Sequence, residues 1–240
     1  MSGLAIAIAP ELAGKVRLGV LVIDGVGVKS EDAALVAEIE AEGAELRSRY
    51  AGGPSAEVPG AADARALYKA MGLDPTKTRP SNEALLRRVL KGEALYRVNT
   101  LVDALNLCSL RYQLPFGLYD LARVRPPVLL RKGRAGESYE GIRKGPVNVQ
   151  DRPTLADGEG AFGNPTSDSA RTMITPQTAS ALVTCYAPAG CSLSRLRQVL
   201  EGTEQALRRA CGGTLVELHI VNEQGGAASH PLGPPLASRE

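Results

Sequence analysis

The sequence has few aromatic residues. Trp is absent, and Phe, Tyr and Trp together make up 4% of the 240 residues. Aromatic rings supply much of the contact area on which nucleic-acid bases stack, so binding through broad base stacking is not expected. The formal net charge is also small, +2, and any polyanionic partner must therefore contact a local basic patch.

Metal-binding and disulfide patterns are lacking as well. The sequence has no CxxC pair, and its cysteines are Cys108, Cys185, Cys191 and Cys211. Only His219 and His230 could join them as zinc ligands. We therefore predict reduced thiols, no metal and no other cofactor.

No targeting or membrane segment is expected. The first residues, MSGLAIAIAPELAGK, lack an early basic region, and their apolar run is too short to span a bilayer. We predict a cytoplasmic protein without a membrane partner. Because 44% of the residues are hydrophobic, the chain can bury one sizeable core.

Amphipathic helices are well represented. A buried strand is predicted at residues 16–28, followed by a helix that begins at Ser30 and carries an acidic outer face. Pro80 and Ser81 mark the start of a further helix, and Gly92 marks its end. Additional helices are predicted at residues 61–72, 98–112 and 192–213.

The middle of the chain has a different texture. Between Pro115 and Val183, Gly and Pro separate short strand-like pieces, among them RTMIT at residues 171–175. A closing strand is predicted at residues 214–221 and a disordered tail at residues 223–240. Because strands and helices are segregated, we predict an α+β fold, a single compact domain with a β-rich middle flanked by helices.

The stretch GEGAFG, residues 158–163, formally matches the GxGxxG dinucleotide-binding pattern. That fingerprint must leave a strand and enter a helix, because the helix N-terminus holds the pyrophosphate. Here Gly163 is followed by Asn164 and Pro165, no helical pattern follows, and no acidic residue stands about twenty residues further on. We reject a dinucleotide site, and a Walker loop fails because the Lys that must precede Ser or Thr is missing.

Two other chemistries also fail on context. In a calcium loop Asp157, Glu159 and Asp168 would be ligands, but Ala161 and Phe162 occupy positions that require a ligand and a turn glycine. The GxSxG motif of serine hydrolases is absent, and both histidines are poorly placed for catalysis. Any hydrolysis would have to use positioned water and fixed donors.

Small hydroxyl side chains are dense beyond the hinge of Gly163, Asn164 and Pro165. The polar residues there are Thr166, Ser167, Asp168, Ser169, Arg171, Thr172 and Thr175. Glycines allow a ligand to approach the backbone, and turn amides can hold a carboxylate or carbonyl oxygen. An ordinary polar turn, in which such side chains bond the nearby backbone, is the alternative interpretation.

Basic residues gather between positions 123 and 152, whereas residues 31–45 are acidic. The basic set is Arg123, Arg125, Arg131, Lys132, Arg134, Arg143, Lys144 and Arg152. Such a run is either a solvated surface or a face that contacts phosphates.

Three segments, in a fixed order, resemble the B3/B4 domain in its freestanding form. This domain is the editing module of the bacterial phenylalanyl-tRNA synthetase beta subunit. The first segment is VNTLVDALNLCSLRYQLPFGLYDL, in which the matching positions are Val102, Asp103, Asn106, Pro115 and Asp120. The others are LLRKGRAGESYEGI and TLADGEGAFGNPTSDSARTMIT, the latter similar to the glycine-rich element that walls the editing pocket.

The resemblance implies a fold and an activity. In the synthetase this module hydrolyses tyrosine wrongly attached to phenylalanine tRNA, in a pocket between its two halves. We expect a B3/B4-like domain at residues 81–222, with residues 1–80 packed on it as a strand and helices. The family's pocket histidine corresponds to Gly117, and its glutamate that reads the tyrosine hydroxyl has no counterpart between Thr172 and Thr175. Tyrosine specificity is therefore not carried over.

The leading hypothesis is an editing-like module that hydrolyses the ester of mischarged aminoacyl-tRNA in trans, with tRNA or aminoacyl-tRNA as its partner. The catalytic candidates are Asp168, Thr166 and Arg171. The substrate-binding candidates are Asn99, Asp103, Asn106, Gly158, Gly160, Gly163, Asn164, Thr172 and Thr175. The RNA-binding candidates are Arg123, Arg125, Arg131, Lys132, Arg134, Arg143 and Lys144.

Two other functions stay open. The chain could be a non-catalytic protein that binds a free amino acid or aminoacyl-tRNA, since two pocket residues of the family are missing. It could also be an enzyme that transfers the aminoacyl group to another acceptor, which rests on analogy of fold alone.

Overall fold

The computed structural model describes residues 3–50 and 52–222. The tail predicted at residues 223–240 lies outside this part of the chain. None of the helices in the described part is both long and apolar enough to cross a membrane.

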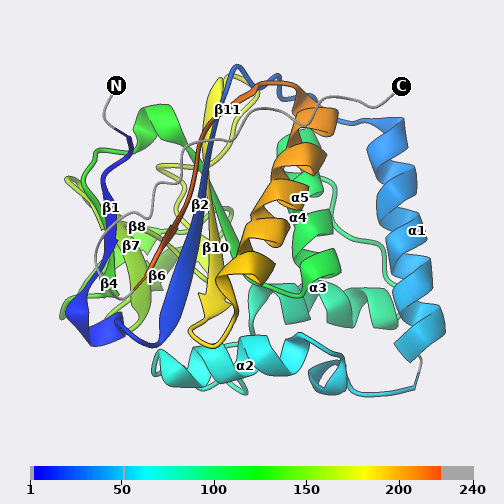
Figure 1. Ribbon diagram of the computed structural model, residues 1–240, viewed down its shortest axis with the longest axis horizontal. Coiled ribbons are helices and arrows are strands. Elements are labelled where there is room, and N and C mark those ends of the chain that lie inside the picture. Colours follow the sequence, from blue (N-terminus) through cyan, green and yellow to red (C-terminus); the bar gives the residue numbers. More distant parts are fainter. Residues whose placement is uncertain (1–2, 51, 223–240) are drawn as a thin grey trace.

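A four-stranded antiparallel sheet forms the middle of the molecule (Figure 1). Its strand order is β11 (Thr214–Val221), β2 (Val16–Asp24), β10 (Ser180–Pro188) and β3 (Phe116–Asp120). The long strands β2 and β10 pair along their whole length, from Val16 opposite Pro188 to Asp24 opposite Ser180. The N-terminal part of the chain thus supplies a central strand of this sheet.

Helices cover one face of this sheet. They are α1 (Ala33–Tyr50), α3 (Ser81–Leu90), α4 (Thr100–Tyr112) and α5 (Leu193–Cys211). Leu21 and Ile23 of β2 belong to the same core cluster as the apolar stripes of these helices. Leu196, Val199 and Leu207 of α5 are fully buried there, as the helical spacing predicts.

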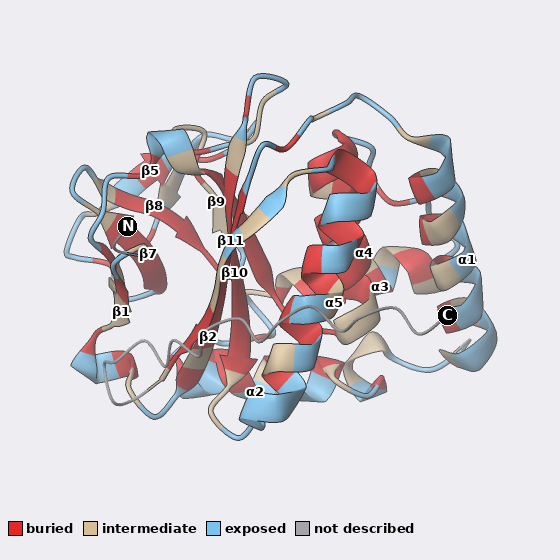
Figure 2. Cartoon of the chain, turned by 45° about the horizontal axis from the view of Figure 1, so that its top comes forward, coloured by how far each residue is buried: buried red, intermediate tan, exposed pale blue. Residues whose placement is uncertain are grey.

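A second sheet covers the opposite face. It has five strands, in the order β1 (Ile6–Ile8), β4 (Val128–Lys132), β7 (Pro153–Asp157), β8 (Gly160–Asn164) and β9 (Ser167–Asp168). Leu18, Val20 and Val22 of β2 point to this side and form a core with Leu155 and Phe162. The β2 strand therefore alternates between two cores, and Figure 2 shows it as a buried layer between the helices and the second sheet.

Smaller elements complete the fold. A two-stranded hairpin is formed by β5 (Ser138–Glu140) and β6 (Pro146–Asn148), and α2 (Ala61–Ala70) adds Leu67 and Tyr68 to the core between the sheets. The short 3-10 helices are η1 (Pro10–Leu12), η2 (Ser55–Glu57) and η3 (Leu121–Arg123). The α+β prediction, with a β-rich middle flanked by helices, is confirmed.

Two local predictions need correction. The first long helix begins at Ala33 rather than at Ser30, because the Asp32 carboxylate accepts a hydrogen bond from Leu35 N and caps the helix. The segment 171–175 is not a strand. Instead of pairing along a ladder, its polar groups bond scattered partners: Thr172 O accepts from Asp120 N at 2.8 Å, and the amide of Thr175 donates to Thr178 Oγ1 at 2.9 Å.

Candidate functional site

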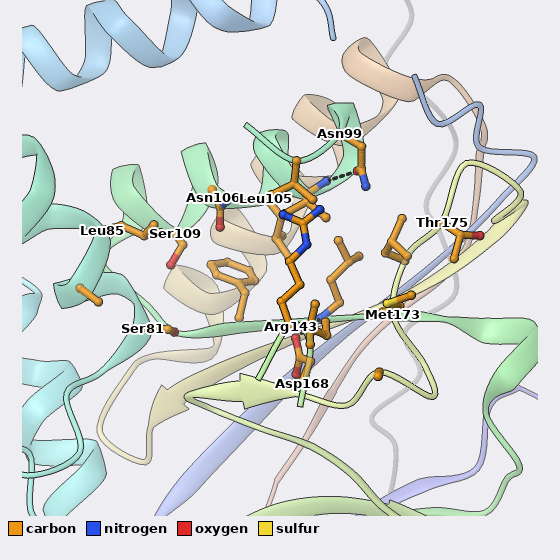
Figure 3. Close-up of a pocket in the computed structure, with 18 of the residues that line it drawn as sticks. Ser81, Leu85, Asn99, Leu105, Asn106, Ser109, Arg143, Asp168, Met173 and Thr175 are labelled. Carbon is orange, nitrogen blue, oxygen red and sulfur yellow. Dashed lines mark hydrogen bonds between the residues drawn. The ribbon is translucent and has the colours of Figure 1, made fainter. Parts of the chain in front are cut away.

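A cavity of about 950 Å³ lies where the helical layer meets the edge strand β3. Its walls come from α3, α4, β3, β9, the β5–β6 turn and residues 170–176 (Figure 3). Most of the lining is apolar and consists of Ala84, Leu85, Val98, Val102, Leu105, Phe116, Leu118, Ile142, Ala170, Met173, Ile174 and Pro176. A volume of this size is typical of sites that bind small molecules.

Asp168 is the single acid among the described residues that line the cavity. It lies on β9, opposite Gly163 of β8, and keeps part of its surface exposed. Its Oδ2 accepts a long hydrogen bond of 3.5 Å from Leu118 N, whereas Oδ1 is buried without a partner. Burial raises the pKa of Asp168 from 3.8 to about 7.

Buried hydroxyl groups surround Asp168 on the side of the sheets. Tyr119 lies beside the carboxyl and offsets part of the rise in its pKa, although the two groups do not reach normal hydrogen-bond geometry. The hydroxyls of Tyr119, Tyr186 and Thr184 are all buried without a partner in the described structure. Burial raises the pKa of both tyrosines, so their hydroxyls stay protonated and carry no charge.

Three cationic side chains also line the cavity. Lys29 and Arg79 lie on its helical side, and Arg79 is 3.8 Å from the carboxylate of Glu83. Arg143 stands in the turn of the β5–β6 hairpin with a φ of 53°, and its guanidinium forms no ion pair within the described chain. Figure 3 shows its side chain extending from the hairpin toward α4. The cavity is therefore apolar in lining but positive in net charge.

The asparagines predicted on α4 have separate roles. Asn99 caps the helix through its Oδ1, which accepts a hydrogen bond from Val102 N at 3.0 Å (Figure 3). Asn106 lines the cavity two turns later, and its amide makes no hydrogen bond to the described protein. Asp103 does not line the cavity, because its carboxylate accepts a hydrogen bond from Val98 N at 3.0 Å and thereby fixes the entry to α4. Burial raises the pKa of Asp103.

The glycines of GEGAFG lie outside the cavity lining. Gly158 and Gly160 lie at the turn between β7 and β8, where Gly160 has a φ of +121° and Gly158 N donates to Arg125 O at 2.8 Å, whereas Gly163 lies within β8. A Cβ at Gly163 would collide with the side chain of Tyr119. These glycines therefore serve a tight turn and close packing between strands.

The hinge that follows is rigidly bonded. Asn164 Oδ1 accepts hydrogen bonds from the amides of Thr166 and Ser167, each at 2.8 Å. This is the ordinary polar turn of the alternative interpretation. Thr166 lines the cavity, and its hydroxyl is 3.1 Å from Tyr68 Oη. The turn thus holds Thr166 and the following β9 in place.

Arg171 and Thr172 point away from the cavity. The guanidinium of Arg171 bonds Asp157 at 2.9 Å and Glu159 at 3.2 Å, which ties the segment after β9 to the β7–β8 turn. Thr172 is fully buried with its hydroxyl 3.1 Å from Ser169 Oγ, whereas Thr175 lines the cavity. Arg171 is therefore a positioning residue in this geometry.

The predicted RNA-binding cations divide into two groups. Arg123, Arg125 and Arg131 have carboxylate partners, and the Arg131 pair with Glu137 at 2.7 Å lowers the pKa of Glu137 to about 2. Among these candidates, Lys132, Arg134, Arg143 and Lys144 form no ion pair within the described chain, although Lys144 Nζ donates a hydrogen bond of 2.6 Å to Ser167 Oγ. This second group has no carboxylate that competes with a phosphate.

Several lining residues were not among the candidates from sequence. They include Lys29, Arg79, Ser81, Phe116 and Met173. Ser81 carried a signal as the start of a helix, and its buried hydroxyl has no hydrogen-bond partner in the described protein. Lys29 and Arg79 come from segments without any motif and could not have been assigned to the cavity.

The fold and cavity define an α+β domain with a ligand-sized cavity between its helices and its sheets. The chain belongs to the B3/4 domain family, whose sequence model matches residues 63–214. The resemblance to the B3/B4 domain is thereby confirmed.

Among the solved structures that match is an N-terminal fragment of the phenylalanyl-tRNA synthetase beta-subunit from Pyrococcus horikoshii, 13% identical, with a TM-score of 0.47. The match covers 90% of this chain and 51% of that chain, so this protein spans about half the length of the fragment. A search of curated proteins found no match.

Proposed function

We propose that the protein hydrolyses the ester bond of aminoacyl-tRNA, with the aminoacyl group in the cavity of about 950 Å³. The observation that carries this proposal is Asp168, the single acid among the described residues that line the cavity. Its pKa of about 7 makes the carboxyl a general base suited to neutral pH.

The chemistry follows from this position. The carboxylate of Asp168 takes a proton from a water molecule, whose oxygen attacks the ester carbonyl carbon. The resulting oxyanion is stabilised by the charge of Arg143 and by the free amide of Asn106. Breakage of the bond to the ribose oxygen then releases the amino acid, and the protonated carboxyl of Asp168 returns a proton to the departing oxygen.

The lining of the cavity also indicates which aminoacyl side chain it accepts. Apolar side chains dominate the walls, and the described lining has no second acid that could read a phenolic hydroxyl. An aminoacyl group with an apolar side chain is the best match to this surface, because burying an unpaired hydroxyl would cost free energy. Thr166 and Thr175 line the same cavity as Asp168, and their hydroxyls are the candidates to orient the water or the amino group.

The experiment is a deacylation assay with a panel of mischarged tRNAs. Release of the amino acid above the buffer rate, for at least one pair, is expected for the wild-type protein and not for Asp168→Asn. If no pair is hydrolysed, the proposal fails. Calorimetric binding of a free amino acid without deacylation would instead identify a binding protein, the alternative favoured by the absence of the family's histidine at Gly117.

A further inference from the structure

A second hollow, of about 360 Å³, adjoins the cavity along α3. Arg79, Ala84 and Leu85 line both hollows, so the two hollows are direct neighbours. We call the outer part, lined by Arg79, Ala84, Leu85, Arg87, Arg88, Lys91, Glu93 and Tyr96, the α3 groove. Figure 3 shows Leu85 on the α3 side of the cavity.

The α3 groove is strongly cationic. Its four cations face one acid, Glu93, which pairs with Arg88 at 3.0 Å. The exposed side chains of Arg87 and Lys91 form no ion pair with the described protein. Cations near a helix C-terminus stabilise the helix through its dipole, which explains why they occur at the end of α3. The dipole does not explain the aromatic ring beside them.

Tyr96 provides that ring. It is 63% exposed, the largest exposure among the large hydrophobic residues of the described chain. The Arg88 guanidinium carbon lies 4.1 Å from the ring centroid, and Arg88 also donates a hydrogen bond of 2.9 Å to the Tyr96 hydroxyl. The ring is thus held in place on one side and remains accessible. Two residues further on, Val98 lines the main cavity.

We propose that the α3 groove binds the single-stranded end of an RNA and leads it into the cavity. A base stacks on Tyr96, and the phosphates contact Arg87 and Lys91. An aromatic platform next to a row of cations is the combination by which proteins hold single strands without reading sequence. The direction of the strand, with its terminal nucleotide at the cavity, rests on the proposed function; the binding itself does not.

Fluorescence anisotropy with a labelled, uncharged RNA of about ten nucleotides tests the groove. Tyr96→Ala is expected to weaken binding roughly 5-fold or more because stacking is removed, and Tyr96→Phe should keep most of the affinity. Arg87→Ala/Lys91→Ala should reduce the slope of log affinity against log salt by about 1.4, which corresponds to two neutralised phosphates. Lys15→Ala/Lys69→Ala is the matched control, because it removes the same charge from exposed positions outside both hollows.

The outcomes separate this proposal from the function of the cavity. Equal decreases in affinity for the groove variant and the control would overturn the groove, whatever the deacylation assay gives. If Asp168→Asn abolishes deacylation but leaves RNA affinity unchanged, both stand. Absence of deacylation for every substrate, with Tyr96-dependent RNA binding intact, would overturn the function alone. Binding of an acidic peptide as tight as that of RNA, and insensitive to Tyr96→Ala, would also overturn the groove as an RNA site.

Discussion

Tyr119 packs against the Cα of Gly163, so that its phenol ring and hydroxyl fill the space where a side chain on β8 would begin. Gly163→Ala is therefore expected to destabilise the protein by about 1–3 kcal/mol, since a tightly packed core tolerates an added methyl group poorly. Urea unfolding measures the effect. Gly190→Ala is the matched control, because a Cβ there meets nothing within 4 Å. Equal unfolding midpoints for the two variants would contradict this packing.

The charge of Asp168 provides a prediction about stability. Its pKa is about 7 in the folded protein against 3.8 ordinarily, so the folded state binds this proton more tightly than the unfolded state. The free energy of unfolding should fall as pH rises through this interval, and the ionised carboxylate destabilises the fold above pH 7. Asp168→Asn should then raise Tm at pH 8, by about 2–4 °C for each kcal/mol gained, while abolishing deacylation. Scanning calorimetry of both proteins at pH 8 and at pH 4 measures this difference in Tm, which should vanish at pH 4.

The carboxyl of Asp168 also determines the pH dependence of catalysis. Because it acts as a base only when ionised, the single-turnover rate of deacylation should rise with pH and level off above about 7, once the buffer rate is subtracted. The charge of Lys144 lowers the pKa of Asp168, so Lys144→Ala should move this midpoint to higher pH. The rate is measured at about six pH values between 5 and 8. If it shows no midpoint in this range, Asp168 is excluded as the base.

Arg171 lies outside the cavity, so removing its side chain should affect the stability of the fold and not the chemistry of the cavity. Its guanidinium bonds the fully buried carboxylate of Asp157, so Arg171→Ala leaves that charge unpaired. We expect a decrease of about 3–5 kcal/mol in the free energy of unfolding. Arg171→Ala/Asp157→Asn should recover part of this decrease, measured by urea unfolding. If Arg171→Ala instead lowers deacylation without changing stability, the residue has a direct role that its position does not explain.

The sequence predicts much of the fold, because helix stripes and strand alternation are local patterns. Leu196 and Val199 on α5 are buried as their spacing indicates. The cavity was only partly predictable. Asp168 and Asn106 were found through a motif and a dense polar stretch, whereas Arg79 lines the cavity only because α3 packs beside α4.

The glycines and the aromatic residues show where sequence patterns are ambiguous. GEGAFG pointed to a pocket wall, but a glycine needed beside a distant ring looks the same in sequence as one beside a ligand, and Gly163 meets Tyr119. The low aromatic content argued against broad stacking surfaces. It could not indicate that one ring, Tyr96, stands exposed among cations.

Full-length tRNA should also contact the basic residues that have no acidic partner. Lys132→Ala/Arg134→Ala is expected to reduce the slope of log affinity against log salt by about 1 for each phosphate that is no longer neutralised.

Arg131→Ala is the matched control. It removes the same kind of charge, but Glu137 already neutralises that charge at 2.7 Å, so the slope should not change. Its effect should be a decrease of about 1.5–3 kcal/mol in stability, because Glu137 loses two charge-assisted hydrogen bonds. Filter binding of tRNA at several salt concentrations separates the two variants, and a smaller slope for Arg131→Ala alone would reverse the assignment.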